Sequence, residues 1–440
     1  MGQFRKAEDS NQGFLFPPSP ADWLPEGHLV WFIRDAVDQL DIDALLDRYR
    51  TSGKGELAYP PRVMLSLLIY GYCTGTFSSR KIAAQIDENV AFRVLARGQR
   101  PSFRTICRFR EEHLDDFKRL FVQIVQLAQE SGLVKMGTIA IDGSKVKANA
   151  SKHKAMSYER MLTEENRLRE EIAKLTRAAK KQDDIDDDSF GPDFRGDELP
   201  QELSRRETRL ATIQAAKQRL EERKAAEAEA KRAAEPKSKG DDPPTAEPSE
   251  RVLPKPRDQE NFTDPESRIM PTSGKSYEQA YNAQIAVDAK QQIVVAASVT
   301  QSTNDHNQMM PVLNEAFENT AKSPARVLAD AGYKNERDFE ALAGLGIDGY
   351  VSVGREGKQA KQPKKEQPQT AAMRRKLATK RGRSRYRMRK AIVEPVFGWV
   401  KRVLGFRAFS LRGLRKVAGE WILVCLALNL RRMATMRVKL

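Results

Sequence analysis

Two aspartates end short apolar runs that lie far apart in the sequence. Asp142 follows the β-type run of residues 138–141, and Asp330 follows a similar run at residues 327–329. Either aspartate alone is most often a turn or helix-capping residue. In open α/β sheets, however, reactive groups collect at strand ends, near the points where the strand order changes. Two carboxylates at such a place indicate a site for a divalent cation such as Mg²⁺, because this ion takes hard oxygen ligands.

A third acid, Glu394, lies in a segment of the opposite charge. It is the only acidic residue from 374 to 417, and its neighbours at 392–397 are otherwise apolar. A surface ion pair with one of the surrounding cations is one interpretation. A metal ligand is the other, because an unpaired carboxylate is costly to bury in an apolar frame. Two metal ions about 4 Å apart, held by three carboxylates, could activate a water or a 3′-hydroxyl for in-line displacement.

Helical spacing would place several residues around this glutamate on one face. Tyr386, Lys390, Glu394 and Lys401 are separated by 4, 4 and 7 positions, which is the spacing of a single helix face. Pro395 opposes a continuous helix, because the residue before a proline avoids helical geometry. We therefore expect Glu394 to lie at a kink or at the start of a new helix.

The net charge of +16 is concentrated in the C-terminal part of the chain. From Arg355 onward there are 25 Lys and Arg against four Glu and no Asp, with aromatic and apolar residues interleaved among the charges. A strongly basic C-terminal segment attached to a mildly acidic remainder predicts a polyanionic partner, most simply nucleic acid. A solvated basic tail is the alternative interpretation.

Composition excludes several other classes of protein. The N-terminal residues lack the apolar core of a signal peptide, and the apolar run at 421–430 is about half of what a bilayer requires. The three cysteines are far apart and form no CxxC pair, so neither a zinc site nor a disulfide framework is indicated. We expect a cytoplasmic protein with no membrane partner and no small-molecule cofactor.

Changes in periodicity divide the chain into parts. The helical part has Arg80, Lys81, Arg104, Arg108 and Arg110 on short helices, which would suit a helix-turn-helix DNA-binding domain; a plain helical scaffold is the other interpretation. Amphipathic segments with leucines at near-heptad spacing predict a coiled-coil-like antiparallel hairpin inserted into the sheet domain. The expected parts are an extended arm (1–24), a helical, DNA-binding domain (25–134), a catalytic domain (135–156 and 261–440), the helical insertion (157–235) and a disordered linker (236–260).

The sheet domain is predicted to be α/β. After the strand that ends at Asp142, two β-type runs flank the turn at 288–292, and a helix, the strand before Asp330, a second helix and a further strand near 347–353 follow. This order favours a mixed sheet flanked by helices.

Taken together, the motifs resemble those of the DDE transposases of bacterial insertion sequences, in particular the 1182-type group. The matching stretches cover most of the chain outside the helical insertion and the linkers. They are "FLFPPSPADWLPEGHLVWFI", "YPPRVMLSLLIYGYCTGTFSSRKI", "NVAFRVLARGQRPSFRTICRFR", "TIAIDGSKVKANASK", "DPESRIM", "YNAQIAVD", "LADAGY" and "RKAIVEPVFGWVKRVLGFRAFSLRGLRKVAGEW".

This resemblance implies an RNase H-like catalytic fold with Asp142, Asp330 and Glu394 as catalytic and metal-binding residues. It implies two Mg²⁺ ions, which Mn²⁺ could replace, and double-stranded DNA as partner, both at the element's terminal inverted repeats and at the target. The expected reaction is phosphodiester cleavage followed by strand transfer, carried out in a homodimer or larger synaptic complex at the nucleoid. The rival functions are a nuclease of the same fold without strand transfer and a non-catalytic, transposase-derived DNA-binding protein.

Related transposases carry a tyrosine–arginine–glutamate–lysine pattern around the glutamate. The six residues between Glu394 and Lys401 match its glutamate–lysine interval, whereas Lys390 stands at the arginine position and Tyr386 is one residue too far from it. The residues expected to contact DNA are Tyr386, Arg389, Lys390, Lys401, Arg402, Lys145, Arg104 and Arg108.

Four further residues are expected to have structural roles, and for three of them a contact with the site or with DNA is the alternative. Asp288 is interpreted as a hairpin-turn residue. Asp305, with His306, is expected to cap the helix that follows, although either could reach the site. Trp399 is expected to be buried, the alternative being a base-stacking contact with unpaired DNA.

Overall fold

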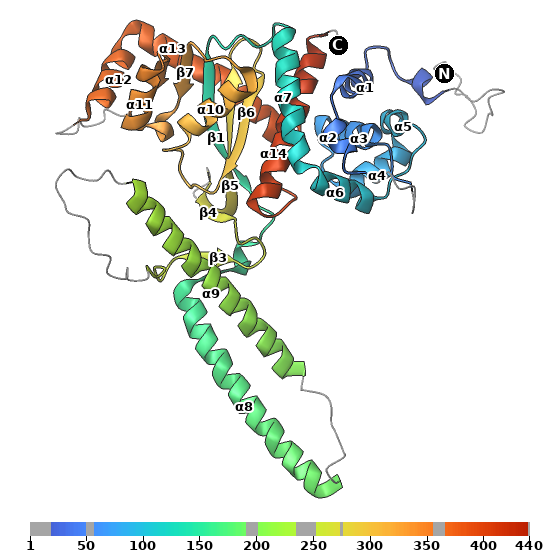
Figure 1. Cartoon of the computed structure of the whole chain (residues 1–440), viewed down its shortest axis with the longest axis vertical. Coiled ribbons are helices and arrows are strands. Elements are labelled where there is room, and N and C mark those ends of the chain that lie inside the picture. The colour runs from blue at the N-terminus through green and yellow to red at the C-terminus, as the bar shows by residue number, and fades with distance from the viewer. Residues whose placement is uncertain are drawn as a thin grey trace, which may run out of the picture. The chain divides into compact units, whose positions relative to one another are not determined.

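The computed structural model describes residues 19–49, 57–190, 201–234, 252–272, 276–354 and 366–438 (Figure 1). The chain forms two compact units. One contains the residues up to Val146 and those from Tyr281 onward, and the other runs from Lys147 to Ala280.

The N-terminal part of the first unit is helical, as predicted. Side-chain caps begin three of its α-helices: His28 accepts the N–H of Val30, Asn89 that of Ala91, and Ser102 that of Thr105. Residues 1–18 of the expected arm lie outside the described residues, and the rest is not simply extended, because Ser19 and Asp22 form a capping box around a short 3₁₀ turn. The elements are η1 (Pro20–Trp23), α1 (Leu29–Gln39), α2 (Asp43–Leu46), α3 (Pro61–Cys73), α4 (Ser79–Glu88), α5 (Val90–Ala96), α6 (Phe103–Glu112) and α7 (Leu114–Glu130).

A mixed sheet follows, and it confirms the predicted RNase H-like α/β class. Among the described residues its strand order is β4-β5-β1-β7-β8, with β6 paired to β5. β5 and β6 form the predicted antiparallel hairpin, whereas β1 with β7 and β7 with β8 are parallel. The strands are β1 (Ile139–Lys147), β4 (Arg268–Pro271), β5 (Tyr277–Asp288), β6 (Val294–Thr300), β7 (Arg326–Ala329) and β8 (Asp348–Val351).

Helices cover this sheet. α10 and α14 pack on β6, and α11, α12 and α13 pack near β7 and β8. They are α10 (Met309–Thr320), η3 (Ala331–Tyr333), α11 (Glu336–Gly344), α12 (Pro368–Ala378), α13 (Lys380–Gly398), the π-helical turn η4 (Trp399–Val403) and α14 (Leu414–Thr435).

The predicted boundary at residues 134/135 does not separate two compact units. α14 is buried on nearly every side, lies along α7 (Figure 1) and packs against α3 as well as against β6. On α14, Asn429 exchanges hydrogen bonds of 2.8 Å with both backbone groups of Val294. The N-terminal helices and the sheet therefore share one core, because a helix that is apolar all round must be covered on all sides.

The second unit contains the predicted antiparallel hairpin of α8 (Tyr158–Phe190) and α9 (Gln201–Ala234). Its polar pairs run in opposite directions along the two helices: Glu171 binds Arg206, whereas Glu165, nearer the start of α8, binds Lys217. Met161 and Leu168 belong to its apolar core, as the heptad-like spacing predicted.

The predicted disordered linker at 236–260 needs a correction at its end. Residues 236–251 lie outside the described residues, but Gln259–Asn261 form strand β3, which pairs with β2 (Ala155–Ser157). Glu260 is buried there and held by Arg219 and Arg223. A strand held by polar contacts with a distant helix has no apolar run to signal it. The short 3₁₀ turn η2 (Lys152–Lys154) precedes β2.

Two local predictions around the acids were wrong. Asp142 does not end its strand, because β1 continues to Lys147. Glu394 does not begin a new helix, because α13 continues through Pro395 to Gly398 before the π-helical turn; a kink there stays a prediction.

Candidate active site

Parallel pairing brings the two aspartates to one edge of the sheet. Ile139 on β1 lies beside Val327 on β7, and Ala140 lies beside Leu328. Two residues further along each strand, Asp142 and Asp330 lie at the same edge, near enough that the charge of Asp330 raises the pKa of Asp142. The sequence-based pairing of these aspartates therefore has a structural basis.

Asp142 is held in a polar but largely enclosed place. Its side chain is 17% exposed, and its Oδ2 accepts a hydrogen bond of 3.1 Å from Nη1 of Arg389. Its other oxygen accepts the N–H of Gly143 at 2.9 Å. Burial raises the pKa of Asp142 to about 6; Arg389 lowers it, and the carboxylates of Asp330 and Asp305 raise it further. Close carboxylates with raised pKa are a common feature of catalytic sites.

Asp330 has both roles that its sequence position suggested. It is the N-cap of η3, and its Oδ1 accepts the N–H of Gly332 at 2.8 Å. Its charge also acts on Asp142, on Arg389 and on the buried Tyr333. The capping interpretation and the site interpretation are therefore compatible.

A third aspartate, Asp305, reaches this site, which the sequence had left open. Its Oδ1 accepts hydrogen bonds from Nδ2 of Asn282 at 2.6 Å and from Nε2 of Gln284 at 2.8 Å, and Nζ of Lys145 lies at 3.4 Å. The hydroxyl of Tyr333 donates to the amide oxygen of Gln284. Asn282 and Gln284, two positions apart within the otherwise apolar stretch 280–287 of β5, were the available signal, since alternate strand residues share a face.

Gly143, which follows Asp142, and Gly332, two residues after Asp330, both pack closely against Asp305. A Cβ on Gly143 would lie under 3.0 Å from Nε2 of Gln284 and 2.8 Å from Oδ1 of Asp305. A Cβ on Gly332 would lie 3.0 Å from Oδ1 of Asp330 and 3.2 Å from Oδ2 of Asp305. These glycines let the backbone approach the carboxylates closely.

Cations from the C-terminal helices border the carboxylates. Arg389 is 8% exposed and binds Asp142 as well as Tyr386. Nζ of Lys401 donates to Oγ of Ser144 on β1, and burial lowers the pKa of Lys401. The structure thus brings Arg389 to the aspartates, whereas Lys390, which stood at the arginine position of the family pattern, is exposed. Tyr386 and Arg389 are three positions apart, which is the tyrosine–arginine interval of that pattern.

Glu394 does not gather with the aspartates in this structure. It is exposed and lies on α13, about one and a half turns after Arg389. Among the described residues, no three His, Cys, Asp or Glu side chains are close enough to hold an ion by themselves. Magnesium, however, often takes only one or two protein carboxylates and completes its shell with water and substrate phosphate oxygens. The oxygen donors of Asp142 and Asp330 fit such an ion.

The other expected DNA contacts are mostly on the surface. Arg402 is exposed. On α6, Arg104 lies over the ring of Phe103 at 5.8 Å, and Arg108 is 73% exposed. Arg110, by contrast, is buried and donates to the hydroxyl of Tyr72, so it cannot form part of an exposed basic helix face.

The structure also tests the expectations for Asp288 and Trp399. Asp288 is buried at the hairpin and accepts the N–H of Lys290 at 2.8 Å and of Met136 at 2.8 Å, so it is a structural turn residue. Trp399 is 37% exposed rather than buried, with the guanidinium of Arg431 5.3 Å from its ring centre.

Two family models match the chain. The model described as Transposase DDE domain matches residues 253–430, a range that contains Asp330 and Glu394, and the model described as Transposase domain (DUF772) matches residues 18–112. The chain belongs to the DDE transposases of insertion sequences. No curated protein and no solved structure matches this transposase.

The family assignment covers both the N-terminal helices and most of the sheet. Asp142 lies before the first matched residue of the DDE model, so only the pairing of β1 with β7 makes it a candidate site residue. The 1182-type group stays a prediction. No helix in the described part of the transposase is both long and apolar enough to cross a bilayer.

Proposed function

We propose that the chain binds the terminal inverted repeats of its insertion sequence, cleaves phosphodiester bonds at the element's ends and joins the 3′-hydroxyls to target DNA. The observation that supports this best is the meeting of Asp142 and Asp330 at one sheet edge, bordered by the cations Arg389, Lys401 and Lys145. Clustered carboxylates beside cations are what metal-assisted chemistry on a phosphate polyanion requires.

Asp142 and Asp330 would hold Mg²⁺, with Mn²⁺ as a substitute and two ions expected per site. Glu394 is proposed as the third ligand on its match to the family pattern, and it lies on the helix that also carries Arg389 to Asp142. When bound, such ions activate the attacking oxygen and stabilise the leaving one. The oxygen atoms that the chain supplies are hard donors of the kind that these ions select.

The chain's own cations would position the DNA strand. Arg389 has a planar guanidinium that can pair with a phosphate in bidentate fashion, and it is the neighbour that now partly neutralises Asp142. Lys401 lies over Ser144 and Lys145, two and three residues beyond Asp142 on β1. Phosphate contacts from such residues, including Tyr386, Lys390 and Arg402, fix the strand's register and make affinity strongly salt-dependent.

Binding of the terminal repeats is assigned to the N-terminal helices. Arg104 and Arg108 are exposed on α6, and Arg80 on α4 lies over the same Phe103 ring, 4.9 Å from its centre. Both element ends must be held together, so a homodimer or larger complex is proposed, with the α8–α9 hairpin as its contact.

The test is to incubate the protein with end-labelled element DNA, a target plasmid and Mg²⁺. The proposal predicts nicks at the element's ends and labelled joined products. Cleavage without joined products would indicate a nuclease, and binding without cleavage would indicate a non-catalytic DNA-binding protein.

A further inference from the structure

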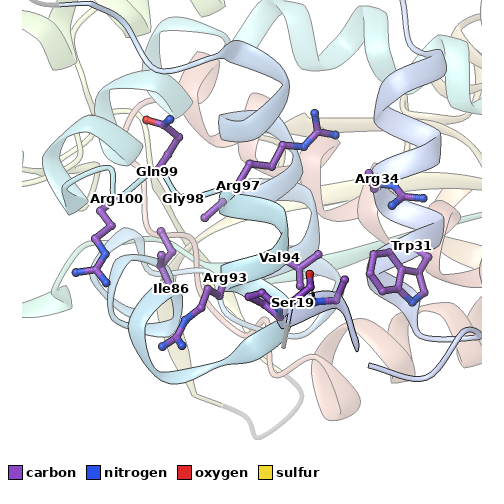
Figure 2. A pocket seen from close by; sticks show the side chains of 13 residues that line it. Ser19, Trp31, Arg34, Ile86, Arg93, Val94, Arg97, Gly98, Gln99 and Arg100 are labelled. Carbon is purple, nitrogen blue, oxygen red and sulfur yellow. Dashed lines mark hydrogen bonds between the residues drawn. The ribbon is translucent and has the colours of Figure 1, made fainter. Parts of the chain in front are cut away.

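A pocket of about 580 Å³ lies beside η1, α1 and α5, away from the carboxylates. Four arginines line it and none of its lining residues, all within the described part of the chain, is acidic. In the view of Figure 2, Trp31 and Arg34 lie to the right and Arg100 to the left, with Arg93 and Arg97 between them. The arginines of the pocket are Arg34, Arg93, Arg97 and Arg100.

The acids that pair with these arginines stand outside the pocket lining. The pairs are Arg34–Asp35 at 2.8 Å, Arg97–Asp38 at 3.6 Å and Arg100–Asp87 at 3.5 Å. The arginine side chains are 41%, 53% and 78% exposed in that order. Ion pairs with such exposure contribute little stability, so the guanidinium groups can turn to a stronger partner at small cost.

Two of the four arginines also contact neutral groups. The guanidinium of Arg34 lies 5.0 Å from the ring centre of Trp31, and that ring is fixed by a hydrogen bond of 2.9 Å from Nε1 to the carbonyl of Pro25. Arg93 donates to the backbone carbonyl of Asp87. Partners of this kind position a side chain without neutralising its charge.

We propose that this arginine pocket binds the sugar–phosphate backbone of DNA, independently of sequence; the proposal rests on the proposed function. Each guanidinium presents a planar fork of donors that matches two phosphate oxygens. A pocket with four such forks and no lining carboxylate suits successive phosphates of one strand. Arg93, Arg97 and Arg100 belong to α5 and the turn after it, and α5 packs against α4, which carries Arg80. The pocket therefore extends the basic surface of the N-terminal helices.

Fluorescence anisotropy of a labelled DNA duplex of arbitrary sequence tests this, using the full-length protein over a range of salt concentrations. Each phosphate contact that is lost lowers the slope of log affinity against log salt by about one. Arg97→Gln and Arg100→Gln are expected to lower the slope by about one each, and the variant with all four arginines changed to Gln by about three to four. Arg119→Gln on α7, which is 65% exposed and outside the pocket, is the matched control and is expected to leave the slope nearly unchanged.

The outcomes separate this proposal from the proposed function. If the four-arginine variant has the same salt slope as Arg119→Gln, the arginine pocket does not bind DNA and this proposal is overturned. Cleavage of element DNA by the wild-type protein would still support the proposed function. Inorganic phosphate that abolishes duplex binding at low concentration would indicate a small-anion site and also overturns it. If the four-arginine variant does not fold, Arg100→Gln decides, because that side chain is largely exposed. Wild-type protein that binds duplex but never cleaves element DNA contradicts the proposed function instead.

Discussion

Replacing Gly143 by alanine is expected to destabilise the site from within. The added Cβ would lie under 3.0 Å from Nε2 of Gln284, which is fully buried, and 2.8 Å from Oδ1 of Asp305. Overpacking of this kind costs about 1–3 kcal/mol. Movement of Gln284 would also break its 2.8 Å bond to Asp305, and hydrogen bonds to charged groups contribute about 1.5–3 kcal/mol. Together the free energy of unfolding should fall by about 3–6 kcal/mol.

Urea unfolding followed by tryptophan fluorescence measures this loss. One of the four tryptophans, Trp421, donates from Nε1 to the carbonyl of Gln284 at 3.1 Å, so part of the signal comes from beside the site. Gly137→Ala is the matched control, because a Cβ there would meet no atom within 4 Å; its stability should change by less than about 1 kcal/mol. Equal stability of the two variants would refute the close approach of Gly143 to Gln284 and Asp305.

Three further predictions concern titration and the carboxylates. Burial raises the pKa of Glu315 on α10 from 4.5 to about 7, so the free energy of unfolding falls as the pH rises from about 4.5 through 7. Thermal melting near pH 8 should show that this loss of about 3 kcal/mol is absent in Glu315→Gln and still present in Glu318→Gln, where the changed side chain is exposed. Asp142, with its pKa raised to about 6 by burial, must lose its proton to bind a cation, so Mn²⁺ affinity measured by calorimetry should fall about tenfold per pH unit below 6; a flat profile would exclude Asp142 as a ligand. Asp305→Asn replaces a carboxylate, which only accepts hydrogen bonds, by an amide, which also donates, opposite the amide donors of Asn282 and Gln284. It should lower the free energy of unfolding by about 1–3 kcal/mol and slow DNA cleavage; unchanged stability would contradict the polar network.

Much of the fold could be predicted because its signals are local. The β5–β6 hairpin, the strand before Asp330 and the heptad-like spacing of Met161 and Leu168 each depend on residues close in sequence. The same holds for Asp330 as an N-cap. The packing of α14 against α3, and the strand β3 held by Arg219, depend on contacts between distant segments, which periodicity does not reveal.

The candidate site follows the same division. The pairing of Asp142 with Asp330 could be expected, because each follows a short β-type run and reactive groups of α/β sheets collect at one end of neighbouring strands; the continuation of β1 past Asp142 could not. The place of Asp305 could not, because it depends on the register of β5 and on the approach of Gly143 and Gly332. Helix geometry likewise decides that Arg389, and not Lys390, reaches Asp142.

The most direct test of the central claim is the rate of Mg²⁺-dependent cleavage of element-end DNA by Asp142→Asn and Asp330→Asn. Both variants should retain DNA binding and lose at least about a hundredfold in rate, more than the loss typical of residues that only support a metal ligand. Glu394→Gln should behave alike if it is the third ligand, and the exposed Glu340→Gln on α11 is the control. Wild-type rates for Asp142→Asn and Asp330→Asn at saturating Mg²⁺ would contradict the assignment of this sheet edge as the catalytic centre.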